Sequence, residues 1–445
     1  MATDLTCGKP MPLLIKYSLP MFLSVAFQQI YNIADSIIAG RYIGEDALAA
    51  IGASYPITML FIAVATGMSA GCSVIISQQF GMKSYENTKT AIYTALSSTA
   101  VLSVLLTLVG MLFCNNIMTL IDTPKNIFDS SADYLRIYIF GLLGLFIYNI
   151  CNAAFTSMGD SKTPLYLLIG SSVGNIILDI VFIRDFQMGV SGAAWATLIA
   201  QGMSAVVAFI ILNVRLKKLV CERYRIFSFE LLAKITKVSI PSILQQSFVS
   251  VGNIFVQRVV NGFGSSVIAG YSSAVKINTF SVITMSTMSN AFANFTAQNI
   301  GASKVDRIKE GFKNASVITI AIGAVFTGVY LIFSDSLIAM FLKDGEGIEA
   351  VKCGSEFLRI VAPFYIIIGM KILCDGVLRG AALMGQFMSA TFLDLLLRVA
   401  LAYILPSIFN THTSIWFSWP VGWTIAAVIS GGFYLKGDWK KRGVV

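Results

Sequence analysis

Two aspartates lie inside long apolar stretches of this sequence, where a charged side chain is rare and costly. Asp35 lies in the first stretch and Asp179 in the fifth, and an unpaired charge at the bilayer centre costs about 2.5–3.5 kcal/mol on insertion scales. Asn175 precedes Asp179 by four residues, so the two share a helix face. Asn32 lies one turn before Asp35, and Thr197 lies in the sixth stretch. Together these side chains offer carboxylate, amide and hydroxyl oxygens.

Such a set of oxygens suits either of two ions. A hard cation such as Na⁺ would take the oxygens as ligands. Protons could bind instead, because burial and a second nearby carboxylate both favour the neutral form of a carboxyl group. Asp35, Asn175, Asp179 and Thr197 are therefore predicted to hold a coupling cation, Na⁺ or H⁺. The alternative is that the two aspartates only bond to backbone or water and hold the helices together.

Other kinds of chemistry find little support in the residue types. The single histidine, His412, lies in a short polar segment, and the seven cysteines show no metal-like spacing. We therefore expect no Ser-His-Asp catalysis, no cysteine or histidine metal site and no cofactor. The GDSKT stretch at 159–163 lacks the phosphate-binding loop of a GxxxxGK[ST] motif, so we expect neither nucleotide hydrolysis nor an enzyme.

The elements that position the two aspartates must lie in a membrane. Hydrophobic residues make up 56% of the chain and charged residues 12%, against about 25% charged in soluble domains. Crossing about 30 Å of hydrocarbon takes about 20 apolar residues, and only helices or closed barrels satisfy their backbone groups there. An all-α polytopic membrane protein is predicted, with twelve transmembrane helices at about 11–39, 49–79, 91–115, 131–157, 163–184, 190–214, 234–261, 269–299, 313–341, 353–380, 386–407 and 416–436.

The twelve spans form two copies of six. KYSLP, ending at Pro20, returns as KVSIP, ending at Pro241, about 220 residues later. An even number of spans per copy makes this a parallel repeat about the membrane normal. We expect an N-lobe at 1–214 with the cation site, a cytoplasmic linker at 215–233 and a C-lobe at 234–445. Val256 stands where Asp35 would recur, so only the N-lobe has this carboxylate.

Basic residues concentrate in the loops on the side of the N-terminus, which predicts cytoplasmic N- and C-termini in the inner (plasma) membrane. The net charge of +9 then indicates contact with an anionic membrane surface rather than with nucleic acid. The basic linker has two interpretations. It is either an amphipathic segment on the membrane, with Phe227, Phe229 and Leu231 toward lipid, or an ordinary loop.

Pro20 is predicted to bend the first span, because proline lacks an N–H and its ring clashes with the preceding turn. The alternatives are a switch element fifteen residues before Asp35 and a static kink.

In the second half, Lys371 and Asp375 are four residues apart, as are Asp394 and Arg398, so both sets are predicted to pair. Asn32, Gln245, Gln246, Lys276 and Phe280 could line a cavity, although a phenylalanine at helical spacing is often simple packing.

Several segments resemble the multidrug and toxic compound extrusion (MATE) family. They are NAAFTSMGDSKTPL at 152–165, GNIILD at 174–179, GVSGAAWATLIAQ at 189–201 and DGVLRGAALMG at 375–385, together with Pro20 and Asp35. The resemblance covers essentially the whole chain and implies V-shaped lobes and cation-coupled antiport. In the prokaryotic branch it implies an N-lobe coupling site at Asp35, Asn175, Asp179 and Thr197. Another branch has an acidic residue where Gln245 and Gln246 stand, which argues against a C-lobe cation site here.

We therefore expect a monomeric antiporter that exports small amphipathic organic compounds or drugs in exchange for H⁺ or Na⁺, by alternating access. The alternative is a lipid-linked precursor flippase of the same wider superfamily. A cationic cavity open sideways to lipid would favour the flippase.

Overall fold

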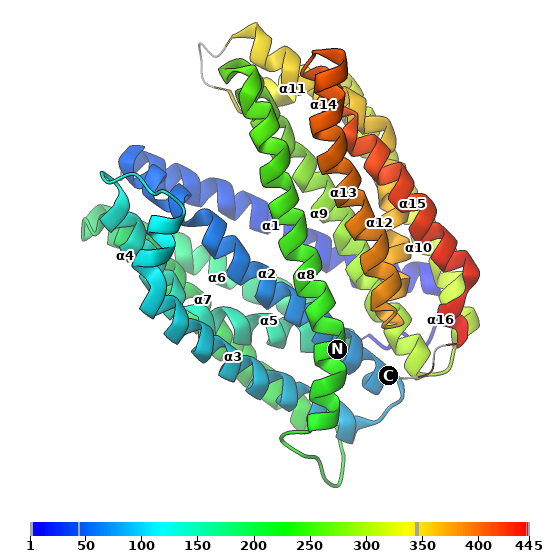
Figure 1. The fold of residues 1–445 in the computed structure, drawn as a ribbon. Helices are drawn as coiled ribbons and strands as arrows, with labels where there is room; N and C mark the ends of the chain where they lie inside the picture. Colours follow the sequence, from blue (N-terminus) through cyan, green and yellow to red (C-terminus); the bar gives the residue numbers. More distant parts are fainter. Residues whose placement is uncertain (1–2, 43–44, 343–346, 442, 444–445) are drawn as a thin grey trace. The chain divides into compact units, whose positions relative to one another are not determined.

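The computed structural model describes residues 3–42, 45–342, 347–441 and 443, and all regular structure in these residues is helical (Figure 1). The elements of the first half are α1 (Pro10–Tyr42), α2 (Glu45–Gly81), α3 (Tyr85–Leu120), α4 (Phe128–Phe140), α5 (Leu142–Ser157), α6 (Lys162–Asp179), the π-helical turn η1 (Ile180–Asp185) and α7 (Gly189–Lys217). Those of the second half are α8 (Phe229–Val260), η2 (Asn261–Phe263), α9 (Ser265–Gly301), α10 (Val305–Ala339), α11 (Ile348–Val361), η3 (Ala362–Phe364), α12 (Tyr365–Gly380), α13 (Met384–Phe409), α14 (Thr413–Trp416), α15 (Ser418–Lys436) and α16 (Asp438–Lys441).

The helices confirm an all-α polytopic membrane protein. Within the described residues, eight helices are long and apolar enough to cross a membrane, or nine if the α4–α5 pair is one span. Every predicted stretch lies on a helix or a broken helix and extends at most two residues beyond it, whereas several helices begin or end three to eight residues outside the predicted bounds. The long helices α8, α9 and α15 fall outside the eight, and α9 is rich in Ser, Thr and Asn.

Two predicted spans are interrupted rather than continuous. The span at 131–157 consists of α4 and α5, which meet at Gly141 with a bend of 46°. The span at 353–380 consists of α11 and α12, joined by the 3₁₀ turn Ala362–Phe364 around Pro363. Glycine and proline both weaken a helix interior, which accounts for breaks at these positions.

The chain divides into two compact units, and α1 and α8 each contribute to both. Unit 1 consists mainly of Leu19–Ile243, and unit 2 consists of Leu5–Ser18 together with the chain from Leu244 onward. The unit boundary falls just before Pro20 in α1 and just after Pro241 in α8.

Helix α5 forms the centre of unit 1, where it packs against α2, α3 and α7. Its Phe146, Ile150 and Phe155 are fully buried. A Cβ at Gly144 would lie 3.2 Å from the Cα of Gly202, so glycine favours the close approach of α5 to α7. Helix α6 also packs against α7, as does the turn η1 that follows Asp179. Helix α7 therefore supports the end of α6 that carries Asp179.

Unit 2 has an aromatic core in which α9 packs against α11 and α12. The ring of Tyr271 stacks on Trp416 at 5.0 Å, and Phe357 lies edge-on to both rings. Trp419 and Trp423 of α15 extend the same buried cluster. Aromatic pairs in these geometries contribute about 0.5–1.5 kcal/mol each beyond area burial, so these contacts stabilise the packing within unit 2.

Candidate functional site

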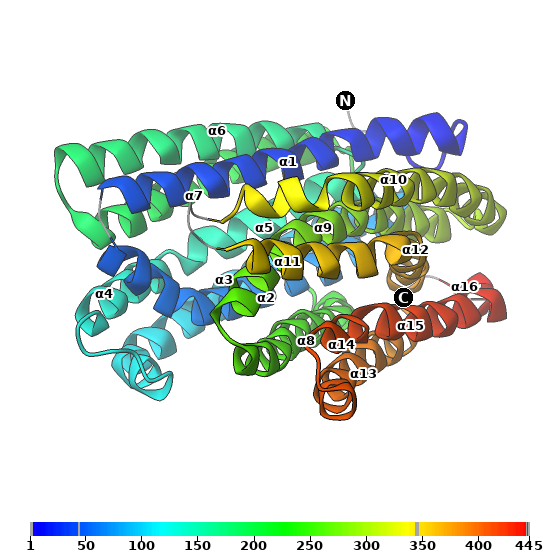
Figure 2. The same cartoon turned by 90° about the horizontal axis from the view of Figure 1, so that it is seen from above.

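Unit 1 brings the two membrane-depth aspartates together. The second part of α1 runs beside α6 (Figure 2), and the carboxyl groups of Asp35 and Asp179 are within hydrogen-bonding reach of each other. Asp179 is the last residue of α6 and is fully buried, whereas Asp35 is half-buried. Two carboxyl groups can bond to each other only when one holds a proton, and two charged ones repel, so a proton or a cation would stabilise this arrangement.

Two tyrosines, which the sequence analysis missed, complete the surroundings of the pair. Tyr31 lies one turn before Asp35, and Tyr134 projects from α4; both interact electrostatically with both aspartates. The hydroxyl groups of Tyr31 and Thr197 form a hydrogen bond, so Thr197 joins the site through Tyr31. The four-residue spacing of Tyr31 and Asp35 was the available sequence signal for the first tyrosine. No signal in the sequence links Tyr134 to them.

Asn175 and Asp179 present buried polar atoms without partners. Asn175 is 2% exposed, and within the described part of the chain neither atom of its amide group has a hydrogen-bond partner. Apart from the Asp35 carboxyl group, which donates only when protonated, no described donor reaches either oxygen of Asp179. Leaving such groups unsatisfied costs about 1–3 kcal/mol each, so these atoms are available to bind a small polar ligand.

The arrangement can hold a monovalent cation or a proton. Two unit negative charges about 5 Å apart repel by about 3 kcal/mol at an effective dielectric of 20, and a positive charge between them removes that repulsion. The donor set of two carboxylates, an amide and hydroxyl groups is the oxygen set that hard cations prefer. The site provides two carboxylates, and the described residues contain no group of three or more His, Cys, Asp or Glu that could hold a metal ion.

The other predicted residues of α1 lie along the same helix. Asn32 is exposed and its side-chain oxygen accepts a hydrogen bond of 3.2 Å from Gln28. Pro20 is buried within α1, which continues as one helix through it. Ser24 donates a hydrogen bond of 2.9 Å to the Pro20 carbonyl. The structure thus places Pro20 at the point where α1 passes from unit 2 to unit 1.

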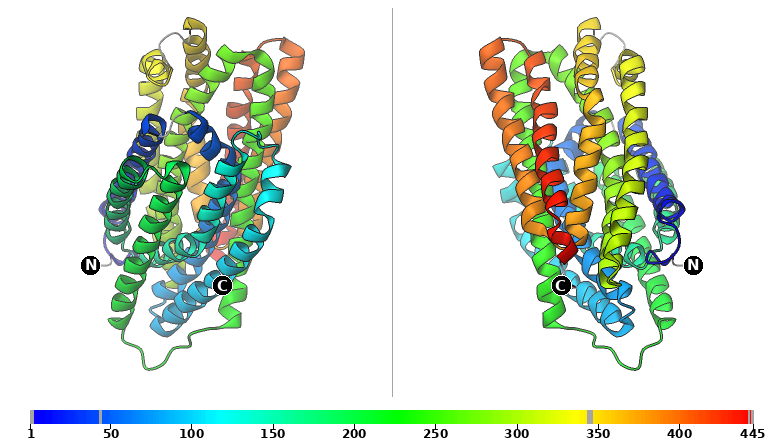
Figure 3. Two further views of the ribbon diagram at one scale, coloured as in Figure 1. Left: turned by 90° about the vertical axis from the view of Figure 1, so that its left-hand side faces the viewer. Right: turned by 90° about the vertical axis from the view of Figure 1, so that its right-hand side faces the viewer.

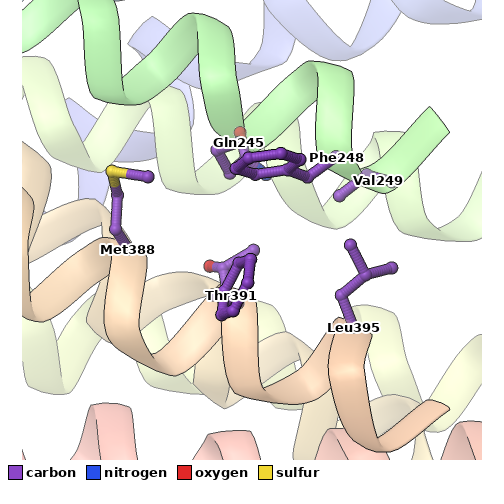
Figure 4. Close-up of a pocket in the computed structure, with 7 residues that line it drawn as sticks. Gln245, Phe248, Val249, Met388, Thr391 and Leu395 are labelled. Carbon is purple, nitrogen blue, oxygen red and sulfur yellow. The ribbon is translucent and has the colours of Figure 1, made fainter. Parts of the chain in front are cut away.

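In unit 2, one of the predicted cavity residues, Gln245, lines a small pocket between α8 and α13. Gln245 and Phe248 of α8 face Met388, Thr391 and Leu395 of α13 across a small pocket (Figure 4). Gln246, on the adjacent position of α8, is exposed and lies outside this pocket, as does Lys276 on α9.

Phe280 is likewise not among the residues that line this pocket. Its ring lies edge-on to Phe326 at 6.0 Å, and its side chain remains 37% exposed.

Both predicted ion pairs of the second half are confirmed. Lys371 and Asp375 lie 2.7 Å apart and are almost fully buried. Asp375 also accepts a hydrogen bond from Ser430, and Lys371 donates one to Thr391. The pair of Asp394 and Arg398 is likewise buried at 2.7 Å. Each of these four charges is paired with one of opposite sign, which leaves the aspartate pair of unit 1 as the candidate ion site.

Comparisons with known proteins agree with this architecture. The MatE family model matches residues 20–181 and again 241–404, once in each half. The chain is 27% identical to "Probable multidrug resistance protein YoeA" of Bacillus subtilis (96% of this chain, 94% of that protein). It is 22% identical to "FAD transporter" of Shewanella oneidensis (76% and 75%). A solved structure described as the outward-facing conformation of a multidrug resistance MATE family transporter superposes with a TM-score of 0.91 at 23% identity, covering 99% of both chains. At that identity the match establishes the fold, including its two lobes of six helices.

Proposed function

The chain belongs to the MatE family of multidrug efflux transporters, and from that premise we propose that it is an antiporter that exports amphipathic organic compounds in exchange for Na⁺ or H⁺. The family consists of transporters rather than enzymes. The predicted lobes, 1–214 and 234–445, would alternate the access of a shared route between the two sides of the membrane. Both termini would lie in the cytoplasm, and the protein would act as a monomer.

The observation that carries this proposal is the contact between Asp35 on α1 and Asp179 on α6. An ion held by both carboxylates joins two helices, and its departure leaves two like charges that repel. Occupancy therefore changes the force between α1 and α6. Entry of one cation supplies about 2.3 kcal/mol per 100 mV of membrane potential, plus about 1.4 kcal/mol per tenfold concentration gradient.

Each residue of the site has a separate role in this scheme. The carboxylates of Asp35 and Asp179 bind the cation, and the Asn175 amide oxygen and the Thr197 hydroxyl group complete its ligands when it is Na⁺. Tyr31, hydrogen-bonded to Thr197, holds that hydroxyl group toward α1. Because these residues come from α1, α6 and α7, the binding site depends on how the three helices pack.

Polar side chains on α8 support a water-filled route for the cargo. Gln246, Ser250 and Asn253 are exposed and follow one another at spacings of four and three residues, so they share a helix face. Amide groups are unfavourable against lipid, so this face suits water and the polar part of an amphipathic compound.

The proposal is tested by transport of a fluorescent amphipathic dye in proteoliposomes with separately imposed Na⁺ and H⁺ gradients. We expect Asp35→Asn to abolish dye export and Asp179→Asn to reduce it at least tenfold, with normal amounts of folded protein. Asp185→Asn is the matched control, because Asp185 lies close in sequence to Asp179 but is exposed. Normal transport by both site variants would show that these acids are structural.

A second candidate is a flippase for lipid-linked precursors, which carry an anionic diphosphate group. Lys276 favours it, because this exposed lysine lies more than ten residues inside the 37-residue helix α9. A cation at that depth is costly unless it faces water or an anionic cargo. Export of polyprenyl-linked cargo without dye transport, and its loss in Lys276→Gln, would favour the flippase.

A further inference from the structure

The connection between α7 and α8 lies at the membrane boundary. Helix α7 is long and apolar enough to cross the membrane and ends at Lys217, and α8 begins at Phe229. The intervening residues 218–228 are not helical and join the ends of the two helices (Figure 3). Because α7 leaves the hydrocarbon at its basic end, the connection lies where lipid headgroups are.

Large apolar side chains on this connection are exposed. The exposed fractions are 87% for Val220, 71% for Ile226 and 80% for Phe229. The interpretation of Leu231 as lipid-facing is wrong, because this side chain is buried in unit 1 at 6% exposure. The other two residues predicted to face lipid are Phe227 and Phe229. Their rings lie edge-on to each other at 4.9 Å, and Phe229 is the more exposed. Apolar groups this exposed are unfavourable in water but are stabilised at the boundary with acyl chains.

Cations alternate with these apolar side chains. Lys217, Lys218, Arg223 and Arg225 are all exposed, and none takes part in an ion pair found among the described residues. Glu222 is the single acidic residue of the segment 217–229. The segment therefore carries excess positive charge, and no ion pair within the described part of the chain neutralises these four cations.

Hydrogen bonds and ring stacking fix the segment on α3. The backbone N–H groups of Arg225 and Ser228 donate to the hydroxyl groups of Thr90 and Thr94, at 3.1 and 3.0 Å. The ring of Tyr224 stacks on Tyr93 at 5.5 Å. Because the backbone is held, the cations and apolar side chains are presented as a preorganised surface rather than by a free loop.

We propose that residues 217–229 form a binding surface for anionic phospholipids. The lysines and arginines would bind the headgroup phosphates, and Val220, Ile226 and Phe229 would insert beside the acyl chains. The positive charge alone, or the exposed apolar side chains alone, would not identify a phospholipid as the ligand. A soluble anionic protein or nucleic acid would not explain apolar side chains at the edge of a membrane span, whereas a phospholipid matches both. This assignment does not depend on the transported cargo or the coupling ion.

The first test measures lipid retention by the full-length protein in native mass spectrometry, with phosphatidylglycerol and phosphatidylcholine as probes. The variant Lys217→Gln/Lys218→Gln/Arg223→Gln/Arg225→Gln is expected to retain several-fold less phosphatidylglycerol and unchanged phosphatidylcholine. The control Lys9→Gln/Lys83→Gln/Lys162→Gln/Lys313→Gln loses the same charge from exposed lysines elsewhere and is expected to retain both lipids. Equal loss in both variants, or no loss in the first, would overturn the assignment.

The second test measures the depth of the apolar side chains. Nitroxide labels are attached through Ile226→Cys or Glu222→Cys, each combined with Cys7→Ser and Cys221→Ser, in phosphatidylglycerol nanodiscs. The label at 226 is expected to be several-fold more accessible to oxygen than to a water-soluble nickel chelate, and the label at 222 the reverse. If both labels are equally accessible to the nickel chelate, the segment does not enter the membrane boundary.

Discussion

The carboxyl groups of Asp35 and Asp179 meet at the end of α6, although 144 positions separate them in the sequence. One comes from a helix shared by both units and the other from a helix that belongs to unit 1 alone. A ligand at this contact therefore acts directly on α1, the one helix of the site that also reaches unit 2. Ion occupancy and the position of α1 are linked by this relationship.

Because both ions need the same carboxylates, we predict that Na⁺ and H⁺ compete. Raising the pH removes protons from the pair and should strengthen Na⁺ binding, and lowering the pH should weaken it. Isothermal titration of the purified protein with Na⁺ across a pH series measures this dependence. Asp35→Asn should abolish it, and Asp185→Asn should leave it unchanged. Na⁺ affinity that is independent of pH in the unsubstituted protein would exclude a shared site.

We predict that Pro20→Ala slows transport while Na⁺ binding is retained. Proline leaves the carbonyl group four residues earlier without a helical donor, and alanine restores that hydrogen bond and stiffens α1. Pro406→Ala is the control, since Pro406 also lies inside a helix but near the end of α13. Transport rates and Na⁺ affinity are measured on the same preparations. An unchanged rate in Pro20→Ala would show that the proline is a static kink.

Helices α2 and α8 approach so closely in unit 1 that Gly71 cannot be replaced without a clash. A Cβ at Gly71 would lie 2.6 Å from the backbone of Ser239, whereas a Cβ at Gly52 of the same helix meets nothing within 4 Å. We expect Gly71→Ala to lower the free energy of unfolding by about 1–3 kcal/mol and Gly52→Ala to leave it unchanged or slightly raised. Denaturant unfolding in detergent compares the two. Similar stability of both variants would contradict the observed packing.

The buried pair of Lys371 and Asp375 should be far more costly to break than an exposed one. Asp375→Asn leaves the Lys371 charge without its carboxylate at 5% exposure, and such a loss costs about 3–5 kcal/mol. Lys371→Gln/Asp375→Asn removes both charges and should recover part of this stability. Asp306→Asn, which breaks an exposed pair with Lys309, should cost only about 0–1 kcal/mol. A small loss in Asp375→Asn would mean that water already reaches the pair.

The sequence was sufficient to predict those features that depend on local spacing or on the solvent. The spans follow from the length of apolar stretches, and the pairing of Lys371 with Asp375 follows from their position on adjacent turns. Features that depend on packing between helices were not predictable. These include the contribution of Tyr134 to the aspartate pair, the burial of Leu231 and the bend at Gly141. The linkage of Thr197 to Tyr31 also needed the packing of α1 against α7.

The exchange of helix ends between the units bears on how such a chain could have arisen. The first part of α1 packs in unit 2 and the first part of α8 packs in unit 1, so each repeat completes the other. A gene for one repeat alone would encode a chain whose first helix begins outside its own bundle. The simplest stable form of such a chain would be a dimer in which the two copies exchange these helix ends. Fusion of the two genes would then have preserved this exchange and allowed the copies to diverge, as Asp35 and its counterpart Val256 have.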